Sequence, residues 1–317
     1  MDMEKASSQT NLVNRAILLL LAASVASLYV GVQLAPHPDF SGADDYKTEY
    51  AAKQPHVPKS KESMAKPALG SVPESRPDIG SFSLSYNLPS QAEVAVIPAI
   101  FTPAMPTGIA TLPVQDRKQL FVRIMLPLIL SSNKAIRSER VQLEDADAAI
   151  LASLAKQYRV EAETLTQAEL RSELDKRIRP IPVSLALAQA AIESGWGTSR
   201  FTKEANALYG QWAWRAQDGV KPLEASNSRA VIRKFDTLQA SVQSYMKNLN
   251  SHYAYAEFRE GRANIIARNK IPDGIDLARY LTSYAETGAE YVDTIRSVIT
   301  RNKFTNYDRL TLSNTGT

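Results

Sequence analysis

The stretch LALAQAAIESGWG, residues 185–197, reads as an apolar helix that ends in a single carboxylate. Residues four apart on a helix share a face, so Leu185, Gln189 and Glu193 lie along one side. The alanines between them allow neighbouring helices to approach closely. The stretch therefore predicts a closely packed helix, opened by Pro182 in its first turn, within a mainly helical domain.

Glu193 falls at the C-terminal end of this helix, where the helix dipole disfavours a second negative charge. Desolvation beside Trp196, Trp212 and Trp214 would act in the same direction and raise the pKa of the carboxyl group. A carboxyl group with a raised pKa arrives protonated near neutral pH, as a general acid must. The helix alone leaves one alternative open, which is a surface glutamate at a helix end.

Aromatic residues and glycines cluster directly after this carboxylate. All three tryptophans lie within residues 196–214, with Phe201 and Tyr209 among them. Flat rings with polar edges suit stacking on sugar faces, although core packing uses the same residue types. Gly195 and Gly197 allow a sharp turn and a close approach of a ligand to the backbone.

The pattern from Asp116 onward is helical with one interruption. N-cap patterns, Thr166 with Glu169 and Asp236 with Gln239, open two of the helices. Periodicity and proline stops predict helices over 117–130, 145–158, 166–178, 182–194, 276–285 and 289–302, and one after Asp236. Turn residues followed by an alternating pattern over 210–235 predict a small β-hairpin lobe. The expected fold class is mainly α with a small β-lobe.

The N-terminal part of the chain has a different organisation. Residues 16–35 are uncharged and about as long as a bilayer-spanning helix, so they predict a transmembrane signal-anchor after a short cytoplasmic N-terminus, residues 1–15. Residues 36–115 hold 12 of the 17 prolines and predict an extracytoplasmic linker. An apolar strip at 93–105 is an alternative docking site for a partner. Residues 116–310 are then the folded domain.

Composition limits the chemistry. The chain has no cysteine and only three histidines, His37, His56 and His252, so we expect no metal, no cofactor and no Ser/His/Asp triad. Residues 1–115 hold 8 Lys and Arg against 10 Asp and Glu, and the remainder holds 29 against 23, so the folded part is basic. Lys and Arg form no clustered stripe, so we expect no nucleic-acid partner.

The stretch LALAQAAIESGWGTSRF, followed by NALYGQW, is similar to the glucosaminidase family of bacterial peptidoglycan hydrolases and to the Bax group within it. FVRIMLPLILSSN, RKFDTLQASVQSYMKNLNSHYAYAEFR and YLTSYAETGAEYV extend the resemblance to roughly residues 115–303. It does not cover the anchor or the linker. The resemblance implies a lysozyme-like, mainly helical domain with a β-lobe that cleaves the β-1,4 bond between N-acetylglucosamine and N-acetylmuramic acid.

The resemblance also implies roles for individual residues. Glu193 matches the family's catalytic acid, and Tyr284, followed by Ala285, matches a Tyr-Ala motif that the family commonly uses. Glycosidases usually pair two carboxyl groups. Glu224 lies in the corresponding region of the β-lobe, although the Bax group often lacks an acid there, and Asp218 is a poor substitute. The alternatives to Glu224 are Tyr284 and the substrate's own acetamido oxygen acting as nucleophile.

The expected partners are peptidoglycan glycan strands and, through the anchor, the inner membrane, with the catalytic domain in the periplasm. A modest positive charge suits weak attraction to the carboxylates of wall peptides. Two other functions stay open, a lytic transglycosylase and a non-catalytic peptidoglycan-binding scaffold. Residues expected to line the groove for substrate are Gln189, Ser194, Trp196, Tyr209, Gln211 and Trp212.

Overall fold

The structure, a computed structural model, describes residues 76–79, 86–89, 95–213, 215–221, 231–284 and 288–313. All of them belong to the second of two compact units of the chain, Ser71–Thr317. The predicted cytoplasmic N-terminus, the membrane span and most of the linker lie outside the described residues, as do Trp214, Glu224 and Ala285. Within the described ranges, no helix is both long and apolar enough to cross a membrane.

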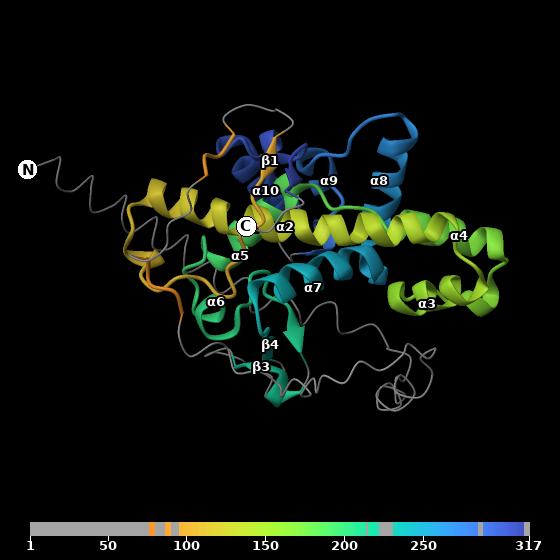
Figure 1. The fold of residues 1–317 in the computed structure, drawn as a ribbon, viewed down its shortest axis with the longest axis horizontal. Coiled ribbons are helices and arrows are strands. Elements are labelled where there is room, and N and C mark those ends of the chain that lie inside the picture. Colours follow the sequence, from red (N-terminus) through yellow and green to blue (C-terminus); the bar gives the residue numbers. More distant parts are fainter. Residues whose placement is uncertain are drawn as a thin grey trace, which may run out of the picture. The chain divides into compact units, whose positions relative to one another are not determined.

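Helix α5 (Val183–Ser194) forms the centre of the described domain. Ten of its twelve residues are buried, and most of these are small or aliphatic. The helices α2 (Val114–Glu144), α9 (Gly274–Ala278) and α10 (Ala289–Arg301) pack against it. The alanine-rich sequence of α5 makes this close packing from several sides possible. In Figure 1, α2 runs across the domain with α7 (Leu238–Ser251) alongside it.

The other helices cover this centre. Helices α3 and α4 pack against each other near the C-terminal end of α2 (Figure 1). The remaining α-helices are α3 (Ala148–Tyr158), α4 (Gln167–Arg177), α6 (Arg200–Ala205) and α8 (Ala256–Ala267). Short 3-10 helices are η4 (Ile109–Thr111), η5 (Ala162–Thr164), η6 (Ala216–Asp218), η7 (Tyr253–Tyr255), η8 (Thr282–Tyr284) and η9 (Phe304–Tyr307).

A small antiparallel sheet follows α6 and forms the β-lobe. Its strands β2 (Trp212–Ala213), β3 (Gly219–Val220) and β4 (Val231–Arg233) lie in the order β2-β4-β3. Ile232 of the middle strand pairs with Trp212 on one side and Val220 on the other. The described residues therefore have the predicted mainly helical fold with a small β-lobe, although the lobe has three strands instead of a simple hairpin.

The end of the predicted linker is part of the folded domain. Strand β1 (Val96–Ile97) pairs in parallel with β5 (Thr311–Leu312) close to the C-terminus. Ile97, Met105 and Ile109 are almost completely buried. The linker boundary predicted at residue 115 is thus too late, because the apolar strip it contains completes the core of the domain.

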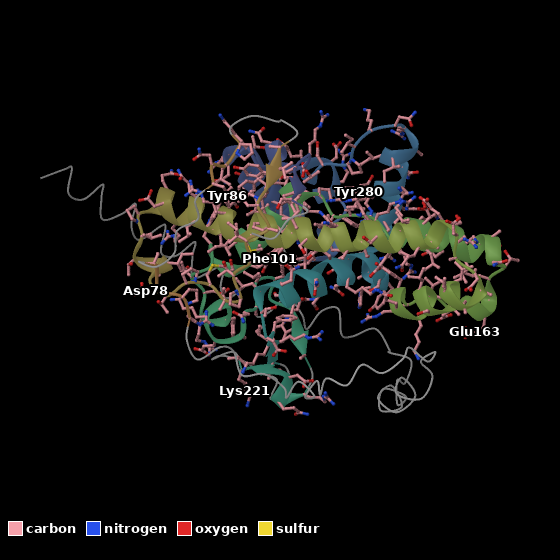
Figure 2. The ribbon with its side chains drawn as sticks, viewed as in Figure 1. Asp78, Tyr86, Phe101, Glu163, Lys221 and Tyr280 are labelled. Atoms are coloured by element: carbon pink, nitrogen blue, oxygen red, sulfur yellow. The ribbon has the colours of Figure 1, made fainter. Side chains whose placement is uncertain are left out.

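The segments before β1 also contact the domain. The hydroxyl of Tyr86, labelled in Figure 2, lies next to α2. It donates a hydrogen bond of 2.7 Å to the carbonyl of Arg123 in that helix. The sequence predicts a docking site for a partner at the apolar strip 93–105 as an alternative. The described part of this strip, from residue 95, packs against the chain itself, although Phe101 remains exposed.

Helix ends follow local capping signals in some places and tertiary contacts in others. Thr166 and Glu169 form the predicted capping box at α4. The predicted N-cap Asp236 is wrong by one residue, because the side chain of Thr237 caps α7. Gln239 instead donates to Leu128 and Ser132 of α2.

Two predicted helix lengths also differ from the structure. α2 continues through Pro127 to Glu144 instead of ending at Leu130. The helix predicted over 276–285 ends at Ala278, and η8 follows after a break.

The start of α5 is fixed by residues distant in sequence. Asn133 of α2 makes two hydrogen bonds with the backbone of Ile181, at 2.8 and 2.9 Å. Asp308 accepts 2.8 Å hydrogen bonds from the backbone and the hydroxyl of Ser184, which places a carboxylate at the positive end of the helix. Burial raises the pKa of Asp308 to about 7. These contacts hold the helix that carries Glu193.

Candidate active site

The C-terminal end of α5 is a sharp turn built from three consecutive left-handed residues. Gly195, Trp196 and Gly197 have φ angles of 57°, 58° and 81°. The backbone N–H of Gly195 bonds to the carbonyls of Ala191 and Ile192 and ends the helix. The turn confirms the expectation that the glycines permit an abrupt change of direction. It leaves Glu193 in the last helical turn, half-buried.

A buried tyrosine holds the carboxyl group of Glu193. The hydroxyl of Tyr291, in α10, donates a 2.8 Å hydrogen bond to Glu193 Oε1. Burial raises the pKa of Glu193 to about 7, and the hydrogen bond from Tyr291 opposes this rise. The carboxyl group is therefore poised to be protonated near neutral pH, as a general acid requires.

Three buried side chains form a chain of hydrogen bonds that ends at this carboxyl group. The hydroxyl of Tyr245 donates to Gln189 Oε1 at 2.6 Å. Gln189 Nε2 donates to the Tyr291 hydroxyl at 3.0 Å. Because the Tyr291 hydroxyl oxygen accepts from Gln189, its own proton is directed to Glu193. Gln189 is fully buried, so it orders Glu193 through Tyr291, and its side chain has no exposed surface for a sugar.

Tyr284 lies beside this chain. Its ring stacks on Tyr291, with centroids 5.3 Å apart and planes 3° apart. Its hydroxyl donates to the carbonyl of Tyr209 at 3.1 Å. The Tyr209 ring in turn stacks on Tyr245 with centroids 3.8 Å apart. The structure thus brings Tyr284 to the site of Glu193 through Tyr291.

The second oxygen of Glu193 faces the backbone that leads into the β-lobe. A Cβ atom placed on Gly210 would lie 3.7 Å from Glu193 Oε2. Gly210 has a φ of 60°, a conformation that other residues rarely adopt. No hydrogen bond reaches Oε2 from the described residues, whereas Oε1 is engaged by Tyr291. Oε2 is therefore the oxygen suited to carry the transferable proton.

Trp196 packs away from a sugar-binding role. Its ring makes an edge contact with Phe121 at 5.7 Å and lies 6.1 Å from Phe304, and Lys118 Nζ lies 4.7 Å from the ring centre. These partners come from α2 and the C-terminal segment. They account for the residue as part of the packing around α5.

Ser194 and Tyr209 also have structural partners. Ser194 is fully buried, its hydroxyl donates to Ala190, and it accepts from the backbone of Gly197. Tyr209 is buried and donates to Ala186 at 3.3 Å. Both side chains shape the turn and the core below Glu193, and neither is exposed to a ligand.

The two predicted groove residues in the β-lobe are partly exposed. Trp212 packs with Ile232 and Phe201 in a small cluster of its own. Gln211 follows Gly210, and its side-chain oxygen is buried without a hydrogen-bond partner among the described residues.

The identity of a second catalytic carboxylate stays a prediction. Glu224 lies outside the described residues. Asp218 is ion-paired with Arg215 at 2.9 Å, which supports its dismissal. Among the described residues, no group of three or more His, Asp and Glu is arranged to hold a metal ion.

Sequence reasoning missed Tyr291 and Tyr245, the two hydroxyl groups of the chain. Tyr245 lies in the helix predicted after Asp236, and Tyr291 lies in the motif YLTSYAETGAEYV, but neither pattern indicates a contact with Glu193. The available signal was that Tyr291 lies in the same motif as Tyr284. Only the packing of α10 on α5 shows that its hydroxyl reaches Glu193.

A half-buried carboxyl group with a raised pKa, at the end of a central helix beside a β-lobe, is the arrangement of a glycosidase acid. Residues 168–304 match the sequence model of the Glucosaminidase family, described as mannosyl-glycoprotein endo-beta-N-acetylglucosaminidase. This range includes the carboxyl group and its whole chain of hydrogen bonds. Residues 168–304 therefore resemble the Glucosaminidase family.

The chain is also similar to Protein bax of Escherichia coli (strain K12). The two are 31% identical over 184 residues, which cover 55% of this chain and 66% of that protein. The chain thus matches just under two thirds of the length of this relative. A solved structure, the catalytic domain of the autolysin Auto from Listeria monocytogenes, is 18% identical. That match covers 62% of this chain and 89% of the autolysin chain, with a TM-score of 0.36.

Proposed function

We propose that this protein is a peptidoglycan hydrolase that cleaves the β-1,4 bond between N-acetylglucosamine and N-acetylmuramic acid. The observation that carries the proposal is the half-buried carboxyl group of Glu193, held by Tyr291 within a domain that resembles the Glucosaminidase family. The similarity to Bax supports this class of activity. Glu193 acts as the general acid and requires neither metal nor cofactor.

Glu193 donates its proton from Oε2 to the glycosidic oxygen, which makes the sugar a better leaving group. Tyr291 then stabilises the carboxylate that remains, because its hydroxyl already donates to Oε1. The partner that attacks or stabilises the anomeric carbon is Glu224, Tyr284 or the acetamido oxygen of the substrate. The position of Tyr284, stacked on Tyr291, supports a role for its phenol near the reacting sugar.

The products of digestion test this function. Purified protein is incubated with sacculi, and the fragments are analysed by mass spectrometry. N-acetylglucosamine at the new reducing ends supports the hydrolase, and 1,6-anhydro-N-acetylmuramic acid would identify a transglycosylase instead. Glu193→Gln should abolish cutting, whereas Glu257→Gln, an exposed glutamate in α8, should leave it unchanged. If Glu193→Gln cuts like the unaltered protein, Glu193 is not the acid. If both proteins bind sacculi and neither cuts, the protein is a scaffold.

The cellular address is part of the same proposal. Residues 16–35 anchor the chain once in the inner membrane, and the glucosaminidase-like domain lies in the periplasm beside its substrate. Protease added to spheroplasts should digest the domain in intact spheroplasts. Protection that lasts until the membrane is lysed would place the domain in the cytoplasm and remove peptidoglycan from its reach.

A further inference from the structure

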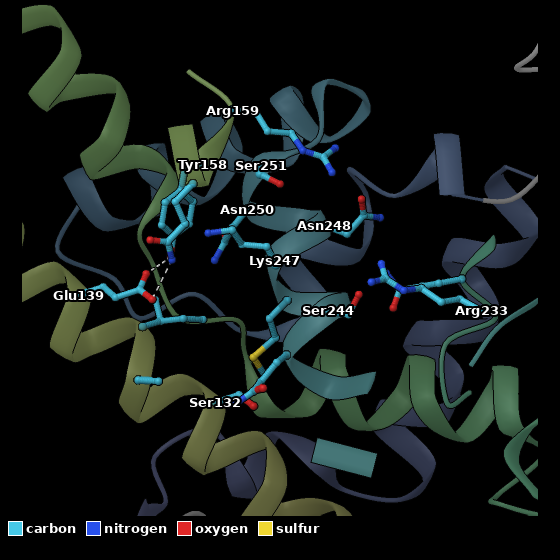
Figure 3. Close-up of a pocket in the computed structure, with 16 residues that line it drawn as sticks. Ser132, Glu139, Tyr158, Arg159, Arg233, Ser244, Lys247, Asn248, Asn250 and Ser251 are labelled. Atoms are coloured by element: carbon cyan, nitrogen blue, oxygen red, sulfur yellow. Dashed lines mark hydrogen bonds between the residues drawn. The ribbon is translucent and has the colours of Figure 1, made fainter. Parts of the chain in front are cut away.

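A polar cavity lies on the face of α7 that turns away from Tyr245. It has a volume of about 600 Å³ and opens between α7, α2, the end of α3 and the β-lobe (Figure 3). One wall, with Glu139 of α2 and Tyr158 and Arg159 at the end of α3, precedes residue 168, where the family match begins. The cavity is therefore built partly from sequence that the family match does not include.

Two exposed arginines mark the outer part of this cavity. Arg159 ends α3 and Arg233 ends β4, and Figure 3 shows Asn248 between their side chains. Neither guanidinium group forms a salt bridge or a side-chain hydrogen bond within the described part of the chain. Each is free to bind an anion, and an arginine binds a carboxylate through two parallel hydrogen bonds.

The inner part of the cavity contains a buried ammonium group. Lys247 Nζ lies 3.4 Å from the centre of the Tyr158 ring and has no hydrogen-bond acceptor among the described residues. Its desolvation lowers the pKa of Lys247 to about 8. Among the described residues that line the cavity, Glu139 is the only carboxylate, and it accepts hydrogen bonds from Gln157 and Tyr158. The three cationic groups therefore outnumber the acid, and the acid is already engaged.

The positive charge of the lining favours an anionic ligand. A neutral sugar offers no charge for the two arginines, whereas a short acidic peptide offers several carboxylates. Gln211 directly follows Gly210, which faces Glu193, so the cavity begins one residue from the candidate active site.

We propose that this cavity binds the acidic stem peptide that branches from the glycan strand held at Glu193. The inference rests on the proposed function, whose substrate carries such peptides. The cavity would then align the strand by its branches and favour glycan that still carries its peptides.

Binding is measured by calorimetry with the full-length protein and a synthetic stem peptide that has free carboxylates. The variant Arg159→Gln/Arg233→Gln should weaken binding about tenfold or more, since two charge-assisted contacts are lost. A control with the same loss of charge, Arg268→Gln/Arg301→Gln, removes exposed arginines outside the cavity and should bind like the unaltered protein. Amidation of the peptide carboxylates should weaken binding as the first variant does.

Equal binding of the free and amidated peptides, or undiminished binding by Arg159→Gln/Arg233→Gln, would overturn the inference. Lys247→Met tests the inner part of the cavity separately and should also weaken binding of the peptide. Thermal unfolding confirms that this variant is folded. Glu193→Gln should bind the peptide normally, because Glu193 does not line the cavity. If the unaltered protein binds the peptide but does not digest sacculi, the proposed function is rejected and the peptide site is retained. If it digests sacculi but does not bind the peptide, the peptide site is rejected and the proposed function is retained.

Discussion

At the scale of single residues, the same feature that makes Glu193 suitable for catalysis costs stability. Its pKa is raised from about 4.5 to about 7 by burial, so the folded protein binds a proton more tightly than the unfolded chain. The contribution of Glu193 to the free energy of unfolding is fully present below the pKa that the group has in the unfolded chain. It is lost as pH rises from about 4.5 to 7. Glu193→Gln removes the charge and keeps the acceptor for Tyr291.

We therefore expect the free energy of unfolding of Glu193→Gln to be about 1–3 kcal/mol higher than that of the unaltered protein at pH 8. At pH 4 the two free energies of unfolding should be nearly the same. Urea unfolding at both pH values measures the difference. Asp308 titrates over a similar range but is present in both proteins, so its contribution cancels. A variant that is less stable at pH 8 would show that the carboxylate is better solvated than its burial indicates.

Tyr291 has a separate effect that the pH dependence of activity can reveal. Its hydrogen bond stabilises the charged form of Glu193 and so lowers the pKa of Glu193. Because the acid must be protonated, kcat/KM should fall as pH rises through about 7. Tyr291→Phe should move this fall to higher pH by roughly half a unit to one unit, the equivalent of one hydrogen bond. Tyr307→Phe, at a buried tyrosine elsewhere, should leave it in place. If Tyr291→Phe lowers kcat/KM but leaves its pH dependence unchanged, Tyr291 contributes through packing and not through its hydrogen bond to Glu193.

At the scale of secondary-structure elements, a buried arginine completes the end of α4. The side chain of Arg262, in α8, is almost completely buried. Its guanidinium group donates to the carbonyls of Arg179 and Pro180 at 3.1 and 3.2 Å, and to that of Lys176 at 2.9 Å. The last carbonyls of a helix have no partner within the helix, so this side chain supplies it.

Arg262→Ala should lower the free energy of unfolding by about 3–5 kcal/mol, because it leaves buried carbonyls without donors and opens a cavity. Arg268→Ala, at the exposed end of the same helix, should change it by less than about 0.5 kcal/mol. Urea unfolding of both variants gives the comparison. Similar losses in the two would mean that water replaces the guanidinium group at the end of α4.

Local signals predicted the elements well where the sequence carried its own cap. Thr166 and Glu169 form a box from four consecutive residues, and the apolar run of α5 needs no partner to be read as a buried helix. At α7 both Asp236 and Thr237 have side chains that can cap a helix; Thr237 is the cap, and Gln239 contacts α2 instead of completing the predicted pattern. The candidate site shows the same contrast between local sequence signals and tertiary contacts. The place of Glu193 at the end of its helix was predictable from the sequence, whereas the contact that Tyr291 makes with it was not, since that contact exists only after α10 packs on α5.

At the scale of the whole domain, the segment before α2 connects the fold to the candidate active site. A Cβ atom on Gly197 would lie 3.0 Å from Met105, so Met105 packs tightly on the turn that follows Glu193. Met105, Ile97 and Ile109 are buried. Burial of each such side chain stabilises a fold by about 1.5–3 kcal/mol. Residues 95–113 are therefore expected to be necessary for both the stability of the domain and the geometry of the turn.

Two truncated proteins test this expectation. A protein comprising residues 71–317 should unfold at the same temperature as the domain in the full chain, because this range is the compact unit. A protein comprising residues 116–317 loses β1 and the buried side chains of 95–113, so it should unfold at a markedly lower temperature and digest sacculi poorly. Calorimetry and the digestion assay give the two readouts. If the protein comprising residues 116–317 is as stable and as active as the one comprising residues 71–317, residues 95–113 are not needed for the fold. The turn after Glu193 then keeps its conformation through Gly195, Trp196 and Gly197 alone.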